Sequence, residues 1–209
     1  MNLAFLASGN GSSLRAIVAA VDVGQLPARP CLVVSNRKAA PALEFARDHG
    51  IATLCIPTTV DPTGADERLA AALRRAGADL VILSGYLRKL GPATLDAFAG
   101  RILNIHPALL PSYGGQGMYG RRVHEAVVAA GERETGATVH LVDGEYDHGA
   151  IVAQVRLPVD PCETAESVER RVMAAEPGLF VETLQRVASG SLILPRSPAH
   201  QPHISDNIS

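Results

Sequence analysis

Short apolar segments alternate along the first half of the chain with segments whose apolar residues recur at helical spacing. The apolar runs lie between turn residues, and they predict buried strands at residues 3–7, 31–35, 53–56 and 80–84. Apolar positions three and four residues apart predict helices around residues 14–21, 40–46 and 69–73. This alternation predicts a single-domain, Rossmann-like α/β fold, a mostly parallel twisted sheet with helices on both faces. Ligands should then bind outside the carboxyl ends of the strands.

The second half of the chain departs from this regular alternation. We expect a fifth strand at residues 102–106, a long irregular loop at 107–117 and a helix at 121–130. Strands at 137–142 and 151–158 should form a hairpin-like pair around the turn 143–149.

A long helical pattern closes the folded part of the sequence. It runs from Thr164 to Ser189, and Pro177 should kink or split it. Residues 192–194 are a candidate strand, and the residues after Pro195 should be loosely held. We therefore expect one domain at residues 1–190 and a C-terminal tail at 191–209.

Composition excludes several classes of function. The chain has 209 residues, 47% of them hydrophobic, and 19 basic against 21 acidic residues give a net charge of −2. Such a balance offers no basic surface for nucleic acid. Its three cysteines are widely spaced, which fits neither a disulfide framework nor a paired-cysteine metal site. The apolar N-terminus is too short for a membrane span, and we expect a cytoplasmic protein.

The first candidate for chemistry is the segment Ser8-Gly-Asn-Gly-Ser-Ser13, between a predicted strand and a predicted helix. Glycines let the backbone approach a ligand closely, and the free N–H groups of a helix start favour an anion. A dinucleotide loop would need glycine at Leu14, and a nucleoside-triphosphate loop would need a Gly-Lys-Ser/Thr ending. A phosphate monoester is the better fit, although a tight turn with a serine cap remains an alternative.

The second candidate is Asn104-Ile-His106, at the end of the fifth predicted strand. Residues two apart share one face of a strand, so both side chains should project together. An amide donor and a titratable imidazole are the groups that a tetrahedral acyl-transfer intermediate requires. The alternative is that His106 is a purely structural histidine.

The third candidate is the acidic turn between the last two predicted strands, residues 143–149. One of its carboxylates is expected to pair with His106, raise its pKa and relay a proton. The turn could equally be a solvated loop. A metal site built from Asp143, Asp147 and His148 matches no defined ligand spacing, and we expect no metal. We expect His140 to be a hydrogen-bonded histidine within a strand and not a metal ligand.

In one register from residue 1 to about 190, these motifs resemble the phosphoribosylglycinamide formyltransferases of purine synthesis. The resemblance implies transfer of a formyl group from 10-formyltetrahydrofolate, a cosubstrate, to the amine of 5-phosphoribosylglycinamide. The product would be formylglycinamide ribonucleotide of the de novo (IMP) pathway, formed by direct attack through a tetrahedral intermediate.

The resemblance also assigns roles to individual residues. It implies a catalytic trio of Asn104, His106 and Asp147, and substrate contacts from Gly11, Ser12, Ser13 and Glu176. The implied folate-binding residues are Leu87, Arg88, Lys89, Leu90, Asn104, Asp143, Gly144, Glu145, Tyr146 and Asp147.

Some positions depart from the usual family pattern. Ser13 stands where asparagine is common, and Met173 replaces a frequent polar residue. A folate-contacting arginine is expected near residue 64, where this chain has Gly64 and the nearest candidate is Arg68. The glycine-rich segment 114–123 is longer than in the shortest members, and we expect it to close over bound ligands as a lid.

Three other functions were weighed against this one. Formyltetrahydrofolate hydrolase is similar in its catalytic part but carries an N-terminal regulatory domain. Methionyl-tRNA formyltransferase carries an extra C-terminal domain. We expect a chain of this length to have room for neither extra domain. A non-enzymatic nucleotide-binding module would keep the glycine-rich loop but would not use Asn104 and His106. We expect small-molecule partners only, and either a monomer or a homodimer.

Overall fold

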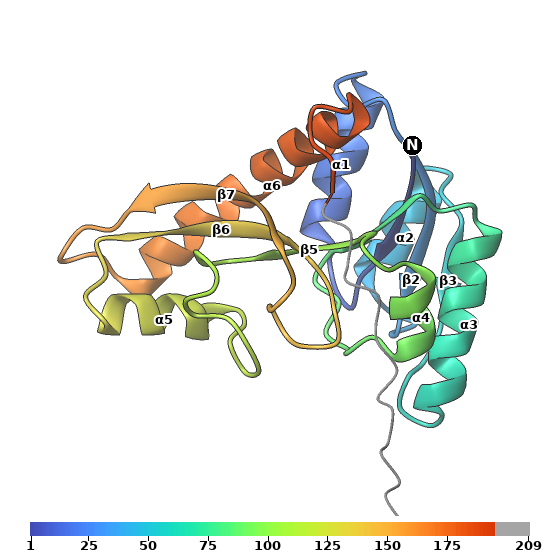
Figure 1. Ribbon diagram of the computed structural model, residues 1–209, viewed down its shortest axis with the longest axis horizontal. Coiled ribbons are helices and arrows are strands. Elements are labelled where there is room, and N and C mark those ends of the chain that lie inside the picture. Colours follow the sequence, from blue (N-terminus) through green and yellow to red (C-terminus); the bar gives the residue numbers. More distant parts are fainter. Residues whose placement is uncertain (195–209) are drawn as a thin grey trace, which may run out of the picture.

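A seven-stranded sheet runs through the computed structural model, which describes residues 1–194 (Figure 1). The strand order is β3-β2-β1-β4-β5-β6-β7, with the first five strands parallel and the last two antiparallel. The mostly parallel sheet and the paired last strands are therefore confirmed. The strands are β1 Asn2–Leu6, β2 Arg29–Ser35, β3 Thr53–Cys55, β4 Leu80–Leu83, β5 Ile102–His106, β6 Glu134–Leu141 and β7 Ile151–Pro158.

Six helices cover the two faces of the sheet in the described chain: α1 Ser12–Asp22, α2 Pro41–Asp48, α3 Pro62–Arg75, α4 Pro92–Ala97, α5 Arg121–Ala129 and α6 Ala165–Ala188. Apolar residues of α1, α2, α5 and α6 pack with Leu3 and Phe5 of β1 in one core cluster. Residues of α3 and the α4 region pack with Ala4 and Leu6 in a second cluster. Alternate residues of β1 thus feed opposite cores, as a sheet buried on both faces requires.

The second face of the sheet is covered in two different ways. Over the parallel strands, α3 and α4 bury it. Over β5 and β6, loops cover it instead: Thr138 of β6 donates to the Ala108 carbonyl at 2.6 Å and accepts the Leu110 N–H at 3.1 Å. Polar side chains on this part of the sheet therefore meet loops, where function can be built.

Four local predictions differ from the structure. The short helix α4 was not predicted, and β6 begins at Glu134, before the predicted residue 137. The proposed strand at 192–194 is absent from the described residues, and the prediction of a loosely held tail after Pro195 lies outside them. Helix α6 runs unbroken through Pro177, so the predicted split is wrong.

Packing explains the continuity of α6. A proline inside a helix removes one backbone donor and crowds the preceding turn. Here Val168 and Val172 on one side of Pro177, and Phe180 and Leu184 on the other, are all buried in the same core cluster. Burial of an apolar stripe along both halves outweighs the local cost of the proline.

Over residues 1–194, none of the helices combines the length and the apolar composition that a membrane crossing requires.

Candidate active site

The register between β5 and β6 gathers polar side chains on the loop-covered face of the sheet. Asn104 lies opposite His140, and His106 lies opposite Thr138, in this antiparallel pair. Facing residues of paired strands point to the same side of a sheet. Asn104 and His106 therefore share one face, as their spacing predicted, and His140 joins them there.

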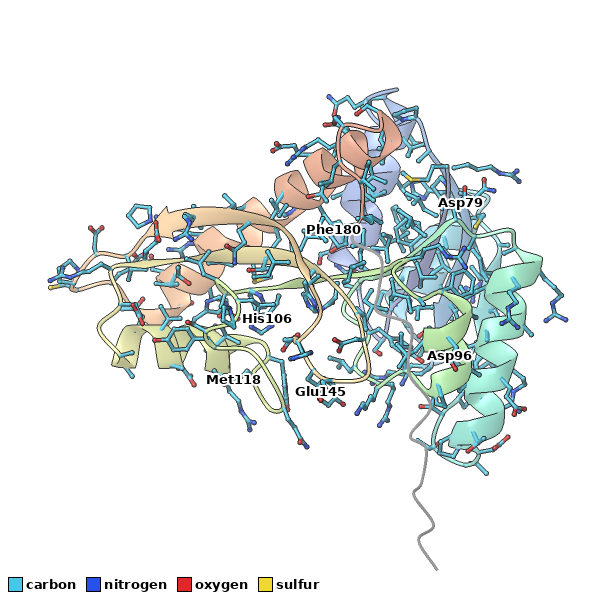
Figure 2. The ribbon with its side chains drawn as sticks, in the orientation of Figure 1. Asp79, Asp96, His106, Met118, Glu145 and Phe180 are labelled. Carbon is cyan, nitrogen blue, oxygen red and sulfur yellow. The ribbon has the colours of Figure 1, made fainter. Side chains whose placement is uncertain are left out.

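The β6–β7 loop brings a carboxylate back onto this face. Asp147 Oδ2 lies 3.4 Å from His106 Nδ1, and Asp147 Oδ1 lies 3.5 Å from His140 Nε2. The Gly115 N–H donates to Asp147 Oδ2 at 3.0 Å. One carboxylate thus stands between two histidines of neighbouring strands. Figure 2 labels His106 of β5 and Glu145 of the β6–β7 loop that carries Asp147.

His106 is almost fully buried, and acceptors face both of its ring nitrogens. Its Nε2 donates to the Tyr113 carbonyl at 2.7 Å, while Nδ1 faces Asp147. Burial lowers the pKa of His106 below 6.5, although Asp147 and the Tyr113 carbonyl both oppose this shift. The expected influence of Asp147 is present, but the expected net rise is wrong, because burial outweighs it.

His140 orients the Asn104 amide. His140 Nδ1 donates to the Leu141 carbonyl at 2.8 Å, and its Nε2 faces the Asn104 amide. Asn104 Nδ2 lies 3.1 Å from that nitrogen and donates to it. The rest of the Asn104 amide stays available for a ligand.

Strained backbone is concentrated beside His106. Among residues 1–194, the non-glycine residues with positive φ are Tyr113, at 57°, and Asp147, at 55°. They are the same two residues that contact the nitrogens of His106. A left-handed conformation costs a non-glycine residue about 1–3 kcal/mol, and such residues cluster at functional sites.

The Asp147 carboxylate is ionised at neutral pH. Burial acts to raise its pKa, but the nearby His140 side chain, the charge interaction with His106 and the Gly115 N–H together lower it. The loop therefore presents a fixed negative charge to the two histidines.

A cleft of about 90 Å³ opens beside this group. Eight of the ten predicted folate-binding residues line it: Arg88, Lys89, Leu90, Asn104, Asp143, Glu145, Tyr146 and Asp147. Lys89 Nζ lies 5.7 Å from the centroid of the Tyr146 ring. A larger cavity of about 660 Å³ adjoins the cleft and shares Tyr86, Arg88, Lys89 and Leu90 with it.

Two predicted residues, Leu87 and Gly144, do not line the cleft. The Leu87 N–H instead donates to Ser8 Oγ at 2.9 Å, and Ser8 Oγ donates to Asn36 Oδ1 at 2.6 Å. The Ser8 N–H also donates to the Gly85 carbonyl. These bonds join the glycine-rich loop after β1 to the segment that leads into the cleft, at the switch point between β1 and β4.

The glycine-rich loop ends at an uncapped helix start. Gly11 is the N-cap of α1, with φ at 70° and no side-chain cap. A Cβ on Gly11 would also lie 3.2 Å from Ala42 Cβ, so glycine is required here on two grounds. Ser12 is exposed and Ser13 is buried. The open N–H groups of this turn form a cradle for an anion.

Glu176 lies on α6, and its side chain is half-buried. Burial raises the pKa of Glu176 to about 7. At neutral pH, this carboxyl is therefore poised between its neutral and charged forms.

The remaining candidates do not assemble into a metal centre. His148 pairs with Asp143 at 3.0 Å on the surface. Over residues 1–194, no three histidine, cysteine, aspartate or glutamate side chains are grouped to hold a metal ion. Two positions that depart from the usual family pattern lie outside the cleft. Met173 is 55% exposed, and Arg68 pairs with Asp61 at 3.1 Å.

Sequence reasoning missed two contributors to the site. His140 could have been found from its place three residues before Asp143, the first residue of the acidic turn, had the strand register been known. Tyr113 acts through its carbonyl, and no side-chain pattern could reveal that.

The family model described as formyl transferase matches residues 1–184. A chloroplastic phosphoribosylglycinamide formyltransferase of Arabidopsis thaliana is 40% identical over 185 residues, which are 87% of this chain and 63% of that protein. This chain thus spans less than two thirds of that relative's length.

The match to a bacterial relative covers most of both proteins. The phosphoribosylglycinamide formyltransferase of Escherichia coli is 36% identical over 194 residues, 92% of this chain and 89% of that protein. The crystal structure of glycinamide ribonucleotide transformylase 1 from Symbiobacterium toebii has a TM-score of 0.84 and 34% identity, covering 93% of this chain and 91% of that one.

Proposed function

The chain belongs to the formyl transferase family, and on that premise we propose that it transfers the formyl group of 10-formyltetrahydrofolate to the amine of 5-phosphoribosylglycinamide. The product is formylglycinamide ribonucleotide, in the de novo synthesis of purines. The observation that carries the proposal is the arrangement of Asn104 and Asp147, which line one cleft, with buried His106 3.4 Å from the Asp147 carboxylate.

The first step is attack of the neutral amine on the formyl carbon, which gives a tetrahedral intermediate with a negative oxygen and a positive nitrogen. The Asn104 amide, held by His140, donates to the negative oxygen. Because Asn104 is oriented before the substrate arrives, little reorganisation is needed as the charge develops. Binding both substrates side by side supplies the proximity advantage.

The second step moves the amine proton to the folate nitrogen as the C–N bond to folate breaks. Asp147 lines the cleft and lies 3.4 Å from His106 Nδ1, so this carboxylate can pass the proton to the neutral His106 ring, whose pKa is lowered. The resulting imidazolium is stabilised by Asp147 on one side and by the Tyr113 carbonyl on the other. It then donates the proton to the leaving nitrogen, which restores neutral His106.

The two substrates have separate supports. The open turn at Gly11, Ser12 and Ser13 suits the 5-phosphate, and Glu176 suits the polar glycinamide ribose part. The cleft lined by Arg88 and Asp143 suits the pterin, and the adjoining 660 Å³ cavity has room for more of the folate. A bound metal has no step in this scheme. We place the reaction in the cytoplasm, since all three cysteines are free thiols.

The test is a formyl-transfer assay with purified protein and 10-formyltetrahydrofolate, with and without phosphoribosylglycinamide. We expect tetrahydrofolate release that depends on the acceptor and matches formylated product one to one. Release at the same rate without acceptor would indicate a hydrolase and contradict the proposal. Absence of release under both conditions would contradict it as well.

A further inference from the structure

We propose that Arg15 is a positioning residue for phosphate recognition, which holds the Asn10–Gly11 peptide so that the Gly11 N–H is directed to the acceptor's phosphate. Arg15 lies in the first turn of α1. This inference rests on the proposed function, because it takes the phosphoribosyl substrate as the ligand of the loop.

The Asn10 carbonyl lies one residue before the N-cap Gly11, so the helix itself offers it no backbone donor. Leu14 is the third residue of α1, and its N–H likewise has no partner within the helix. Here the Leu14 N–H donates to Ser84 Oγ at 2.9 Å, while the Arg15 N–H donates to the Gly11 carbonyl at 3.0 Å. The Asn10 carbonyl instead accepts a hydrogen bond from Arg15 Nε at 3.1 Å.

The hydrogen bond from Arg15 to the Asn10 carbonyl also fixes the direction of the Gly11 N–H. The peptide between Asn10 and Gly11 is trans, so its N–H points opposite to its C=O. With the carbonyl bound to Arg15, the Gly11 N–H is directed away from Arg15, and it donates to no group of residues 1–194. Gly11, with φ at 70°, could otherwise let the exposed Asn10 peptide rotate freely.

Arg15 is itself held in place by an aromatic platform. Its guanidinium carbon lies 4.4 Å from the centroid of the Phe45 ring on α2. Phe45 in turn packs against His49, with ring centroids 4.0 Å apart. Within the described chain no carboxylate pairs with Arg15. The side chain is therefore held by two contacts, and no ion pair within residues 1–194 neutralises its charge near the loop.

Three variants separate positioning from charge and from folding. Arg15→Met removes the donor and the charge but keeps an aliphatic cover over Phe45. Phe45→Leu keeps the charge and the donor but removes the platform. Arg75→Met, at the exposed C-terminal end of α3, removes the same charge far from the loop and serves as the control.

Steady-state kinetics of the full chain give the main readout. Arg15→Met should raise the KM for phosphoribosylglycinamide about tenfold, the scale of one lost hydrogen bond that supports an ionic contact. Its kcat and its KM for 10-formyltetrahydrofolate should stay within about twofold of wild type, because the reacting groups are untouched. Phe45→Leu should raise the same KM by a smaller factor, about threefold, and Arg75→Met should change nothing.

Inorganic phosphate binding, measured calorimetrically, gives a readout that does not depend on turnover. Its Kd should rise in Arg15→Met and in Phe45→Leu but not in Arg75→Met. An unchanged KM in Arg15→Met, an equal loss in Arg75→Met, or an unchanged KM in Phe45→Leu would overturn the positioning role. If wild type transfers no formyl group yet binds phosphate in an Arg15-dependent way, the proposed function fails while the role of Arg15 at the loop stands.

Discussion

The β6–β7 loop makes two histidine–aspartate pairs that behave in opposite ways. Asp147 faces His106, and the two side chains are 12% and 4% exposed. Asp143 pairs with His148, and these side chains are 33% and 70% exposed. In the exposed pair the hydrogen bond and charge of Asp143 raise the pKa of His148, whereas in the buried pair burial lowers the pKa of His106. Burial, rather than the presence of a carboxylate, decides the sign.

The two pairs also contribute differently to stability across pH. His148 gains its partner in the charged form, so its contribution is full below the ordinary histidine pKa and is lost as pH rises through the raised value. The fold disfavours charged His106, so stability falls as pH drops from 6.5 toward its lowered pKa. Asp147, with a lowered pKa, stabilises the fold above its ordinary pKa of 3.8 and loses this contribution as pH falls through the lowered value.

The largest expected difference between the pairs is in turnover. Asp147→Asn and His106→Ala should each lower kcat by about 100- to 10,000-fold, because they remove the proton relay, while KM values change much less. His148→Gln should keep kcat within about twofold, since this exposed ring pairs with Asp143 at the surface. Near-normal turnover in Asp147→Asn, or a comparable loss in His148→Gln, would contradict the distinction.

A second, smaller effect is expected in the pKa values of the two histidine rings, which NMR of labelled histidines can measure. His106 should titrate below 6.5 and His148 above it. Asp147→Asn removes an influence that raises the pKa of His106, so that pKa should fall further. Assignment uses the spectra of His106→Ala and His148→Gln. A His106 pKa above 6.5 in the wild-type protein is the result that this interpretation cannot accommodate.

The smallest expected effect is a response to salt. Screening acts on exposed charges and much less on buried ones. Raising the ionic strength from roughly 0.01 to 1 M should therefore move the pKa of His148 down toward its ordinary value and leave that of His106 almost unchanged. Asp143→Asn should lower the pKa of His148 in the same direction without salt. Equal salt sensitivity in the two rings would show that His106 is more hydrated than its burial implies.

Local patterns predicted most of the fold because most of its elements are locally encoded. The buried strands and the amphipathic α1 follow from residue spacing alone. Helix α4 does not, because its first turn is capped from another element: Asp66 of α3 accepts the Gly91 N–H at 3.2 Å and the Ala93 N–H at 2.8 Å. Pro92 at the first position is a local signal of its start, but six residues are too few to show a periodic apolar pattern.

The part of the site that neighbouring residues encode was also predictable. Asn104 and His106 lie two residues apart on one strand, so a local rule joins them. The contact of Asp147 with both histidines depends on the β5–β6 register and on a left-handed backbone at residue 147. The pKa of His106 depends on how deeply the loops bury it, which no count of neighbouring charges can supply.

The left-handed conformation of Tyr113 and Asp147 bears on any attempt to make this protein more heat-resistant. A common engineering rule replaces non-glycine residues at positive φ with glycine, which relieves strain. At Asp147 that rule would delete the carboxylate that we propose as the proton relay, and at Tyr113 it would loosen the carbonyl that accepts the His106 hydrogen bond. Thermostabilising libraries should therefore exclude both positions, however favourable the backbone gain.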